Sequence, residues 1–174
     1  MLSFEVERPG DARAREALLD ACFGPSRHRK TVARLRRGRR PADGLSLVVR
    51  RDDVLVGTVR LWRVDAGDAG AALLLGPVAV APGLQGEGIG SRLMQAALGR
   101  AKALGHRAVL LVGDPAYYTR FGFRRELAAG LSLPGPVELP RFLALELVPG
   151  ALAHAVGPVV ATGEPATTKR RRAA

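Results

Sequence analysis

Apolar residues recur along the chain with two different periods, and these periods predict where its helices and strands lie. The clearest helix signal covers residues 88–104, where apolar side chains recur every three or four positions, at Ile89, Leu93, Ala97, Ala101 and Leu104. Further helices are predicted over residues 11–23, 28–37 and 116–120. Strands are predicted over residues 2–6, 45–51, 54–64, 72–80, 108–112 and 142–147, with a short edge strand at 131–133.

Turn residues and buried segments indicate how these elements connect. Asp52-Asp53 separates two strands and predicts a hairpin, and Asp11 is expected to cap the first helix. The segment 72–80 is continuously apolar, which is typical of a strand covered on both faces. A helix and a second buried strand follow it, which predicts a crossover unit with two parallel strands. We therefore expect an α/β fold in which a twisted mixed sheet is flanked by helices.

The length and composition favour one folded domain. The chain has 174 residues, of which 47% are hydrophobic, and this is enough for a single packed core. We expect the domain to span residues 1–161. Residues 162–174 lack apolar periodicity and end in a basic run at 169–172, so they are predicted to form a disordered tail.

The chain is strongly basic, with a formal net charge of +11 that comes mostly from arginine. Part of this charge lies on the predicted helix 28–37, which includes Lys30, Arg34, Arg36 and Arg37. One interpretation is an anionic partner, and the other is that most of these side chains lie on a solvated surface. We favour the second and do not expect nucleic acid as a partner, because only 5% of the residues are aromatic and few rings could stack on bases.

Membrane, disulfide and metal chemistry find little support in the sequence. No stretch approaches the ~20 apolar residues that span a bilayer, and the N-terminus lacks the basic start and apolar run of a signal peptide. The single cysteine, Cys22, excludes an internal disulfide and lies on the predicted inner face of the first helix, as a packed thiol would. His28, His106 and His154 have no ligand spacing, so no metal is expected. These features predict a cytoplasmic protein with no membrane contact.

The most informative segment is the glycine-rich run from Gln85 to Gly90, between a buried strand and the amphipathic helix. Glycines there let the backbone approach an anion, and the first amides of the helix are unpaired and point outward, which suits a pyrophosphate. A tight strand-to-helix connection is the plain alternative. A dinucleotide-binding loop would need a third glycine where Ser91 stands, although Asp114 lies about where the ribose-binding acid belongs.

Gln85-x-x-Gly88-x-Gly90, preceded by the segment 76–82, resembles the pyrophosphate-binding signature of the GNAT superfamily of N-acetyltransferases. The resemblance implies the GNAT fold, acetyl-CoA as co-substrate, a loop that holds its pyrophosphate and a strand whose backbone binds the pantetheine arm. It places cofactor binding at Val78, Ala79, Val80, Gln85, Gly86, Glu87, Gly88, Ile89, Gly90 and Ser91. The Glu87 side chain is expected to face solvent, because a pyrophosphate would repel a carboxylate.

A second segment, Tyr117 to Phe123, resembles the Tyr-x-x-x-Gly-Phe motif that follows the fifth GNAT strand. The resemblance implies that Tyr118 faces the thioester sulfur and is the catalytic residue. The alternative is a half-buried core aromatic. Many relatives carry an asparagine just after the fifth strand, where this chain has Gly113-Asp114-Pro115, and a glutamate base in the fourth strand, where residues 73–80 contain no acid. The resemblance therefore does not supply a general base.

Together these features predict an enzyme that transfers an acetyl group from acetyl-CoA to a primary amine of a small molecule or protein. Direct transfer is expected, because no activated Ser or Cys is apparent. The first two GNAT helices border the acceptor groove, so the basic segment could bind an acidic acceptor. Two alternatives stay open: a catalytically silent acyl-CoA-binding sensor, and a basic nucleic-acid-binding module. A homodimer is compatible with the sequence.

Overall fold

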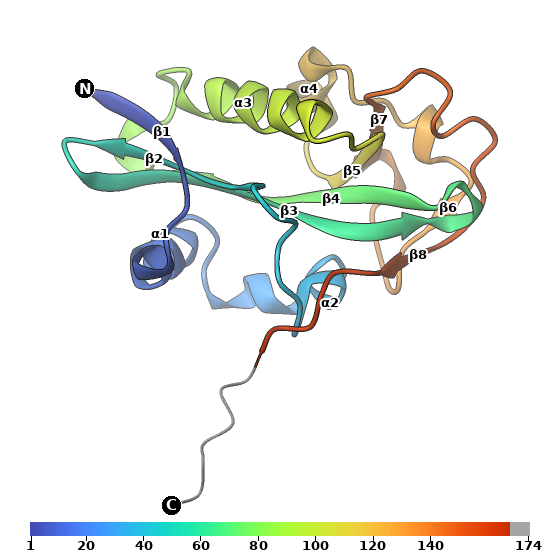
Figure 1. Ribbon diagram of the computed structural model, residues 1–174, viewed down its shortest axis with the longest axis horizontal. Helices are drawn as coiled ribbons and strands as arrows, with labels where there is room; N and C mark the ends of the chain where they lie inside the picture. The colour runs from blue at the N-terminus through green and yellow to red at the C-terminus, as the bar shows by residue number, and fades with distance from the viewer. Residues whose placement is uncertain (168–174) are drawn as a thin grey trace, which may run out of the picture.

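The computed structural model describes residues 1–167 of the chain. A mixed sheet runs through the molecule in the order β1-β2-β3-β4-β5-β7, with helices on both faces (Figure 1). Its strands are β1 (Leu2–Val6), β2 (Ser46–Arg51), β3 (Val54–Ala66), β4 (Ala71–Val80), β5 (Ala108–Val112), β6 (Leu131–Ser132), β7 (Phe142–Glu146) and β8 (Gly157–Ala161). The sheet therefore has the mixed α/β architecture that the sequence predicts.

Four α-helices and several single 3₁₀ turns connect the strands. The helices are α1 (Ala12–Phe23), α2 (Ala33–Arg36), α3 (Ile89–Ala103) and α4 (Pro115–Tyr118). The 3₁₀ turns are Pro9–Asp11, Pro25–Arg29, Gly67–Ala69, Pro82–Leu84, Thr119–Phe121, Glu126–Ala128 and Leu139–Arg141. Helix α3 covers one face of the sheet, and α1 and α2 cover the other (Figure 1).

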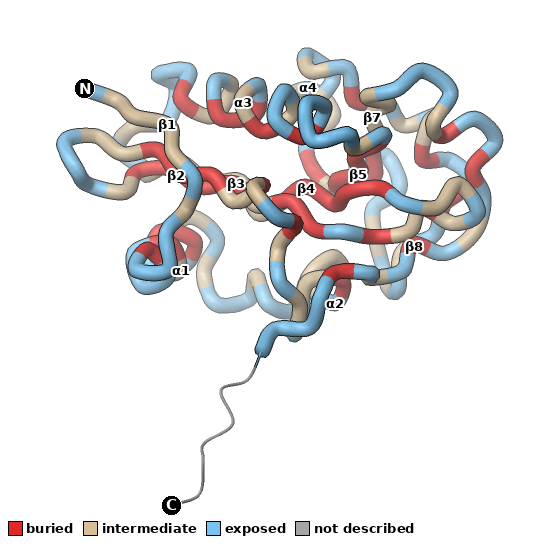
Figure 2. Tube along the Cα trace, in the orientation of Figure 1, coloured by how far each residue is buried: buried red, intermediate tan, exposed pale blue. Residues whose placement is uncertain are grey.

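The core lies on both faces of the central strands, which are buried along most of their length (Figure 2). On one face, Ile89, Leu93 and Ala97 of α3 pack against the sheet, as their helical spacing predicts. On the other face, Leu35 and Trp62 belong to a second cluster of buried side chains. Burying both faces explains the continuously apolar sequence of β4.

An opening between β4 and β5 positions the site. The two strands are parallel, as predicted, but they pair only at Leu73 with Val109 and at Leu74 with Leu110. Strand β4 continues to Val80 along β3, so its last residues have no strand on their other side. The sheet therefore splits at the end of β5, and backbone groups of β4 face the gap.

The basic segment differs from its prediction. Residues 28–37 do not form one helix: the chain makes a 3₁₀ turn, becomes extended at Lys30 and forms only the short α2. The side chain of Thr31 donates to the carbonyl of Pro136, and Arg34 Nη1 donates to the Pro134 carbonyl at 2.5 Å. Like charges four residues apart, such as Lys30 and Arg34, also destabilise a longer helix. The expected inner side chain of this segment, Leu35, is nevertheless buried.

Asp11 does not cap α1 with its side chain, in contrast to the prediction. Its carboxylate accepts from the backbone amide of Arg8 at 2.8 Å and from Arg50 Nη2 at 2.6 and 2.7 Å. The arginine comes from β2, so a contact distant in sequence replaces the local one. This charge-assisted pair lowers the pKa of the Asp11 carboxyl.

The C-terminal prediction is wrong for the first residues of the expected tail. Three backbone hydrogen bonds hold these residues: the Thr162 amide donates to the Arg63 carbonyl at 3.1 Å, the Arg40 amide to the Glu164 carbonyl at 2.7 Å, and the Ala166 amide to the Gly38 carbonyl at 2.8 Å. Strand β8, which the sequence did not predict, brings this segment beside β3. The rest of the predicted tail, residues 168–174, lies outside the described residues.

Candidate active site

The glycine-rich loop follows β4 and leads directly into α3. Gly86 and Gly88 have φ angles of 87° and 79°, a left-handed conformation that favours glycine. A Cβ atom at either position would meet nothing within 4 Å, so the loop surface is open. The first helical hydrogen bond is from Arg92 to the Gly88 carbonyl at 3.1 Å, which leaves the preceding amides of α3 without an intrahelical acceptor. The geometry suits an anion.

A cavity of about 430 Å³, here called the loop cavity, lies against this segment. It is lined by Val78, Ala79, Val80, Leu84, Gln85, Gly86, Gly88, Ile89, Gly90, Ser91, Tyr117, Tyr118 and Arg120. The predicted cofactor residues thus come together, with the exception of Glu87. The carboxylate of Glu87 instead pairs with Arg51 Nη2 at 2.6 Å and is exposed, as the argument from charge repulsion expects.

Three lining residues were not predicted: Leu84, Tyr117 and Arg120. The guanidinium of Arg120 lies 4.7 Å from the centre of the Tyr117 ring. The Tyr117 hydroxyl lies 3.1 Å from the position that a Cβ atom on Gly90 would take. Segment 115–121 therefore lies over the start of α3, a long-range approach that no local sequence signal reveals.

Val80 directs its carbonyl toward the gap between β4 and β5. The next amide, of Ala81, donates to Val56 of β3 at 2.8 Å, so the Val80 carbonyl on the other side of that trans peptide points away from β3. Cys22 Sγ and Gln85 Nε2 both donate to it, each at 3.3 Å. In an extended strand the amide of the same residue points the same way, so the Val80 N–H faces the gap.

Cys22 is a packed thiol, as predicted. It contacts the small cluster of Leu18, Leu19 and Ala79, and burial raises the pKa of its thiol. A raised pKa keeps the sulfur protonated and a poor nucleophile.

Tyr118 lies where the gap opens, and its side chain is largely buried. Its ring packs edge-on against Phe123, with centroids 6.1 Å apart, and against Gly113. A Cβ atom on Gly113 would lie 2.3 Å from the Tyr118 ring, so an asparagine at this position would displace the tyrosine. Burial, assisted by Tyr117 and Asp114, raises the pKa of Tyr118 to about 12, so its hydroxyl stays protonated at neutral pH.

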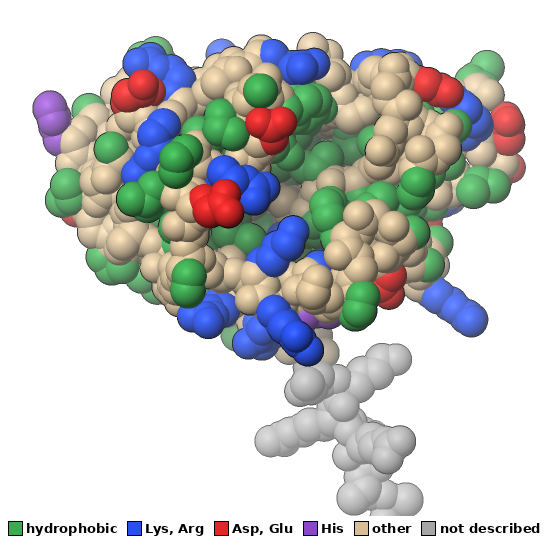
Figure 3. All heavy atoms as spheres, turned by 180° about the vertical axis from the view of Figure 1, so that it is seen from behind, with side chains coloured by type: hydrophobic (Ala, Val, Ile, Leu, Met, Phe, Trp, Pro, Cys, Tyr) green, Lys and Arg blue, Asp and Glu red, His purple; other side chains and the backbone are tan. Residues whose placement is uncertain are grey.

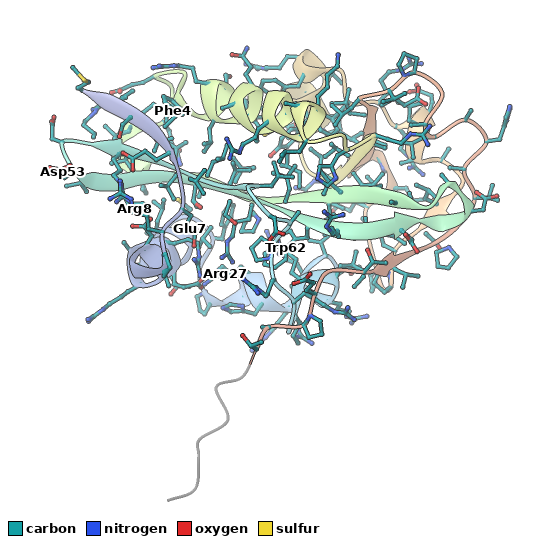
Figure 4. All side chains as sticks on the ribbon, viewed as in Figure 1. Phe4, Glu7, Arg8, Arg27, Asp53 and Trp62 are labelled. Atoms are coloured by element: carbon teal, nitrogen blue, oxygen red, sulfur yellow. The ribbon has the colours of Figure 1, made fainter. Side chains whose placement is uncertain are left out.

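A second cavity, of about 610 Å³ and here called the basic cavity, lies between α1, α2 and the sheet. It shares Val78, Tyr117 and Tyr118 with the loop cavity, so the two cavities meet at the gap. Leu75 and Leu111, directly beyond the last paired positions of β4 and β5, line it. Trp62 also lines it and donates from Nε1 to the Gly76 carbonyl at 2.7 Å. Figure 4 shows the labelled Trp62 on the side of the sheet that α1 and α2 cover.

The basic cavity is rich in cationic side chains. They are Arg15, Arg27, Lys30, Arg36, Arg37, Arg60 and Arg141, against the acids Glu16 and Asp114. Figure 3 shows Lys and Arg side chains spread over the face that it draws, including its centre and lower part. Burial, with the charges of Arg27 and Arg60 nearby, lowers the pKa of Arg36 to about 10, so this guanidinium remains charged at neutral pH. The sequence identified the segment 28–37 as basic but could not show that Lys30, Arg36 and Arg37 line a cavity.

Residues 13–123 match the family model for the acetyltransferase (GNAT) family. The chain belongs to this family. It is 36% identical to the uncharacterized N-acetyltransferase YhbS of Escherichia coli K12 over 129 residues, which cover 71% of this chain and 73% of YhbS. It is 29% identical to the uncharacterized N-acetyltransferase YjhQ of the same strain over 141 residues, which cover 79% and 77%.

Solved GNAT structures share the fold. The crystal structure of YhbS from Escherichia coli in complex with CoA superposes with a TM-score of 0.76 at 29% identity, covering 92% of this chain and 89% of YhbS. A GNAT acetyltransferase from Brucella melitensis, in complex with acetyl-CoA, superposes with a TM-score of 0.62 at 29% identity, covering 97% of each chain. The expected GNAT fold and N-acetyltransferase class are thereby confirmed.

Within this GNAT site, the carboxylates that line the basic cavity are already engaged. Glu16 pairs with Arg15 and Arg27, and Asp114 accepts from the amide of Ala116 at 3.0 Å at the start of α4. Across residues 1–167, no group of three or more His, Cys, Asp or Glu side chains is placed to hold a metal ion. None of the helices described is long and apolar enough to cross a membrane.

Proposed function

We propose that this GNAT chain transfers the acetyl group of acetyl-CoA directly to a primary amine, at the point where its two cavities meet. The observation that carries the proposal is the shared lining of Val78 and Tyr118 at the gap between β4 and β5. The complexes of YhbS with CoA and of the Brucella enzyme with acetyl-CoA support the loop cavity as the cofactor side. The basic cavity is then the acceptor side.

The loop cavity offers groups for each part of the cofactor. The free amides at the start of α3 suit the pyrophosphate, and the helix dipole adds to their attraction. Arg120 provides a nearby positive charge. The backbone of Val78 and Val80 faces the gap and suits the amides of the pantetheine arm. The residues present therefore fit acetyl-CoA.

Acetyl-CoA supplies an activated acyl group with a thiolate leaving group, and the protein residues position and polarise it. The Val80 amide faces the gap and is the donor best placed to hydrogen-bond the acetyl oxygen. Tyr118 keeps its proton and can donate it to the departing thiolate sulfur. The proton of the attacking amine passes to water, since the carboxylates lining the basic cavity are engaged.

The role of Tyr118 is tested by Tyr118→Phe, which keeps the ring and deletes the hydroxyl. General-acid help is worth about 10²–10⁴-fold, and a thiolate leaves readily, so the rate of CoA release should fall at least about tenfold. Acetyl-CoA affinity by calorimetry and the melting temperature should change little. Tyr117→Phe is the matched control and should be nearly silent. Wild-type rates in both variants would make Tyr118 a structural aromatic.

The arrangement of charge argues against the nucleic-acid alternative. Arg27, Lys30 and Arg36 contribute to the wall of a cavity that Tyr118 also lines, whereas a duplex is bound on an open basic surface. The silent-sensor alternative is separated from the enzyme by turnover of acetyl-CoA with amines.

A further inference from the structure

We propose that the amine acceptor is a small molecule that also carries an anionic group, a carboxylate or a phosphate, bound by Lys30, Arg36 and Arg141. This inference rests on the proposed function, because it takes the basic cavity as the acceptor side. The shared chemistry of the two groups is a compact set of oxygen acceptors that hydrogen-bond to cations.

Three other cations of the basic cavity have acidic partners, which Lys30, Arg36 and Arg141 lack among the described residues. Arg15 pairs with Glu7 and Glu16, Arg27 pairs with Glu16 and Asp20, and Arg60 pairs with Glu7 at 3.1 Å. Arg37 has no acidic partner in the described part of the chain, but its Nη2 donates to the backbone carbonyl of His28 at 3.2 Å. Glu7 and Arg27 lie together with Trp62 beneath the sheet in Figure 4. These pairs neutralise one part of the cavity wall and leave another part uncompensated.

Lys30, Arg36 and Arg141 form that uncompensated part. Within residues 1–167, none of the three makes an ion pair, and Lys30 Nζ lies 5.0 Å from the centre of the Phe23 ring. They come from three separate segments. Lys30 directly follows the 3₁₀ turn Pro25–Arg29, Arg36 ends helix α2, and Arg141 ends the 3₁₀ turn before β7. Partial desolvation and the charges of Arg141 and Arg36 lower the pKa of Lys30, so Lys30 is close enough to each of these two cations to be repelled by it. An anion between them would relieve this repulsion.

The position of this cluster fits a short acceptor. Arg141 is near enough to Tyr118 to oppose the rise in the pKa of that hydroxyl. The Arg36 guanidinium lies 3.4 Å from the position of a Cβ atom on Gly76, at the β4 side of the gap. The anionic group would therefore lie close to the reacting amine. A cavity of about 610 Å³ is of the size that holds small molecules.

The same charges would also prepare the amine for attack. Cations beside the bound acceptor disfavour its ammonium form and lower its pKa, which raises the fraction of neutral amine. This effect compensates in part for the lack of a free carboxylate base in the basic cavity. The cluster thus serves both binding and reactivity.

The test uses Trp62, the single tryptophan of the chain, as a fluorescent reporter in the wall of the basic cavity. With saturating CoA present, so that the loop cavity is filled, two matched pairs are titrated: O-phosphoethanolamine against ethanolamine, and β-alanine against β-alaninamide. The anionic member of at least one pair should bind about tenfold more tightly or better, since charge-assisted hydrogen bonds are strong. Comparison of the pairs tells a phosphate site from a carboxylate site. Sodium chloride should weaken the preference.

Variants assign the preference to the cluster. Arg36→Gln should reduce the preference for the anionic amine by about tenfold, and so, independently, should Lys30→Gln, at an exposed position. The melting temperature is checked for each variant. Arg13→Gln is the matched control, because Arg13 is exposed on α1 and does not line the basic cavity. It should keep the full preference.

The outcomes separate this inference from the proposed function. Equal binding of charged and neutral members, a preference unchanged in both Lys30 and Arg36 variants, or no response to any of the four amines would overturn the inference. Binding of peptides with acidic residues but of none of the four amines would also overturn it, in favour of a protein acceptor. If neutral and anionic amines were acetylated at equal rates, the proposed function would stand and the inference of an anionic acceptor would fail. If the anionic amines bound tightly but released no CoA when acetyl-CoA was supplied, the proposed function would fail instead.

Discussion

Gly113 shows how a single residue can set the geometry of the site. The Tyr118 ring occupies the space of a side chain at position 113, with 2.3 Å between the ring and an ideal Cβ atom. Gly113→Ala should displace the ring, lower the melting temperature and slow acetyl transfer, because overpacking typically destabilises by about 1–3 kcal/mol. Differential scanning calorimetry and the rate of CoA release measure the two effects.

The control for this change is Gly99→Ala, within α3. A Cβ atom there meets nothing within 4 Å, so alanine should be neutral or should stabilise the helix by up to about 1 kcal/mol. If Gly113→Ala behaves like this control, the packing of Tyr118 on Gly113 is not tight in solution.

The raised pKa of Tyr118 predicts the pH dependence of acetyl transfer. Its folded value is about 12, above the ordinary value of about 10, so the hydroxyl keeps its proton throughout the range in which amines deprotonate. The rate should rise with pH and show no fall from loss of the Tyr118 proton between about pH 8 and 10. Tyr118→Phe should give the same profile at a lower rate. A falling limb below pH 10 that the variant lacks would contradict the assignment.

Local sequence could identify some of these residues but not others. Helical spacing identified Cys22 as a packed thiol, and its surroundings agree with that expectation. A motif identified Tyr118, whose catalytic role stays a prediction. Arg120 and Arg141 could not be found in this way, since each acts through an approach of segments that are distant in sequence. The sequence also could not tell which arginines have acidic partners, because those partners lie on other elements.

At the scale of elements, the strand β4, the glycine-rich loop and α3 act as one unit. Gly88→Val should weaken CoA binding at least about tenfold, because its side chain would enter the loop cavity where phosphate oxygens must approach the amides. Gly88 has a φ angle of 79°, so the substitution also costs roughly 1–2 kcal/mol of backbone strain. Calorimetry on the folded variant measures the affinity.

Gly105→Val separates strain from obstruction. Gly105 follows the other end of α3, has a φ angle of 87° and lies outside both cavities. The Gly105→Val variant should be destabilised about as much as Gly88→Val but should bind CoA normally. Equal loss of affinity in the two variants would attribute the effect of Gly88→Val to strain alone.

The predicted elements fail where local pattern and tertiary contacts disagree. Helix α3 was found because its apolar period is strong, and β4 because its apolar run is continuous, and both patterns agree with their burial. The basic segment has helix-forming residues, but repulsion among them and hydrogen bonds to residues 134 and 136 break it. Strand β8 was missed because it begins Gly-Pro and is held by pairing with β6 and β3 rather than by its own composition.

At the scale of the molecule, the high net charge is unevenly compensated. Acidic side chains neutralise part of the basic cavity and leave the cluster of Lys30, Arg36 and Arg141 without them. The sequence suggested a solvated surface for most of the charge, and it offered an acidic acceptor only through the likeness to GNAT helices. The proposal of an anionic acceptor rests on the positions of the acids, which depend on the complete fold.

The segment after β8 connects this cluster to the rest of the molecule. Residues 162–166 hydrogen-bond to β3 and to residues 38–40, which directly follow α2 and its Arg36. Arg39 Nη1 also donates to the Gly163 carbonyl at 2.8 Å. Truncation after Ala161 should therefore lower the melting temperature by several degrees, since each hydrogen bond contributes about 1 kcal/mol and 1 kcal/mol shifts it by about 2–4 °C.

Truncation after Thr167 is the matched control, because it keeps the described hydrogen bonds and should melt near the full chain. The shorter chain should also lose part of the preference for anionic amines in the Trp62 titration, since release of residues 38–40 lets α2 and Arg36 move away from the gap. CoA binding at the opposite end of the gap should persist, because the loop cavity contains no residue of this segment. Equal melting temperatures of the two truncated chains would mean that residues 162–167 do not hold α2 in place.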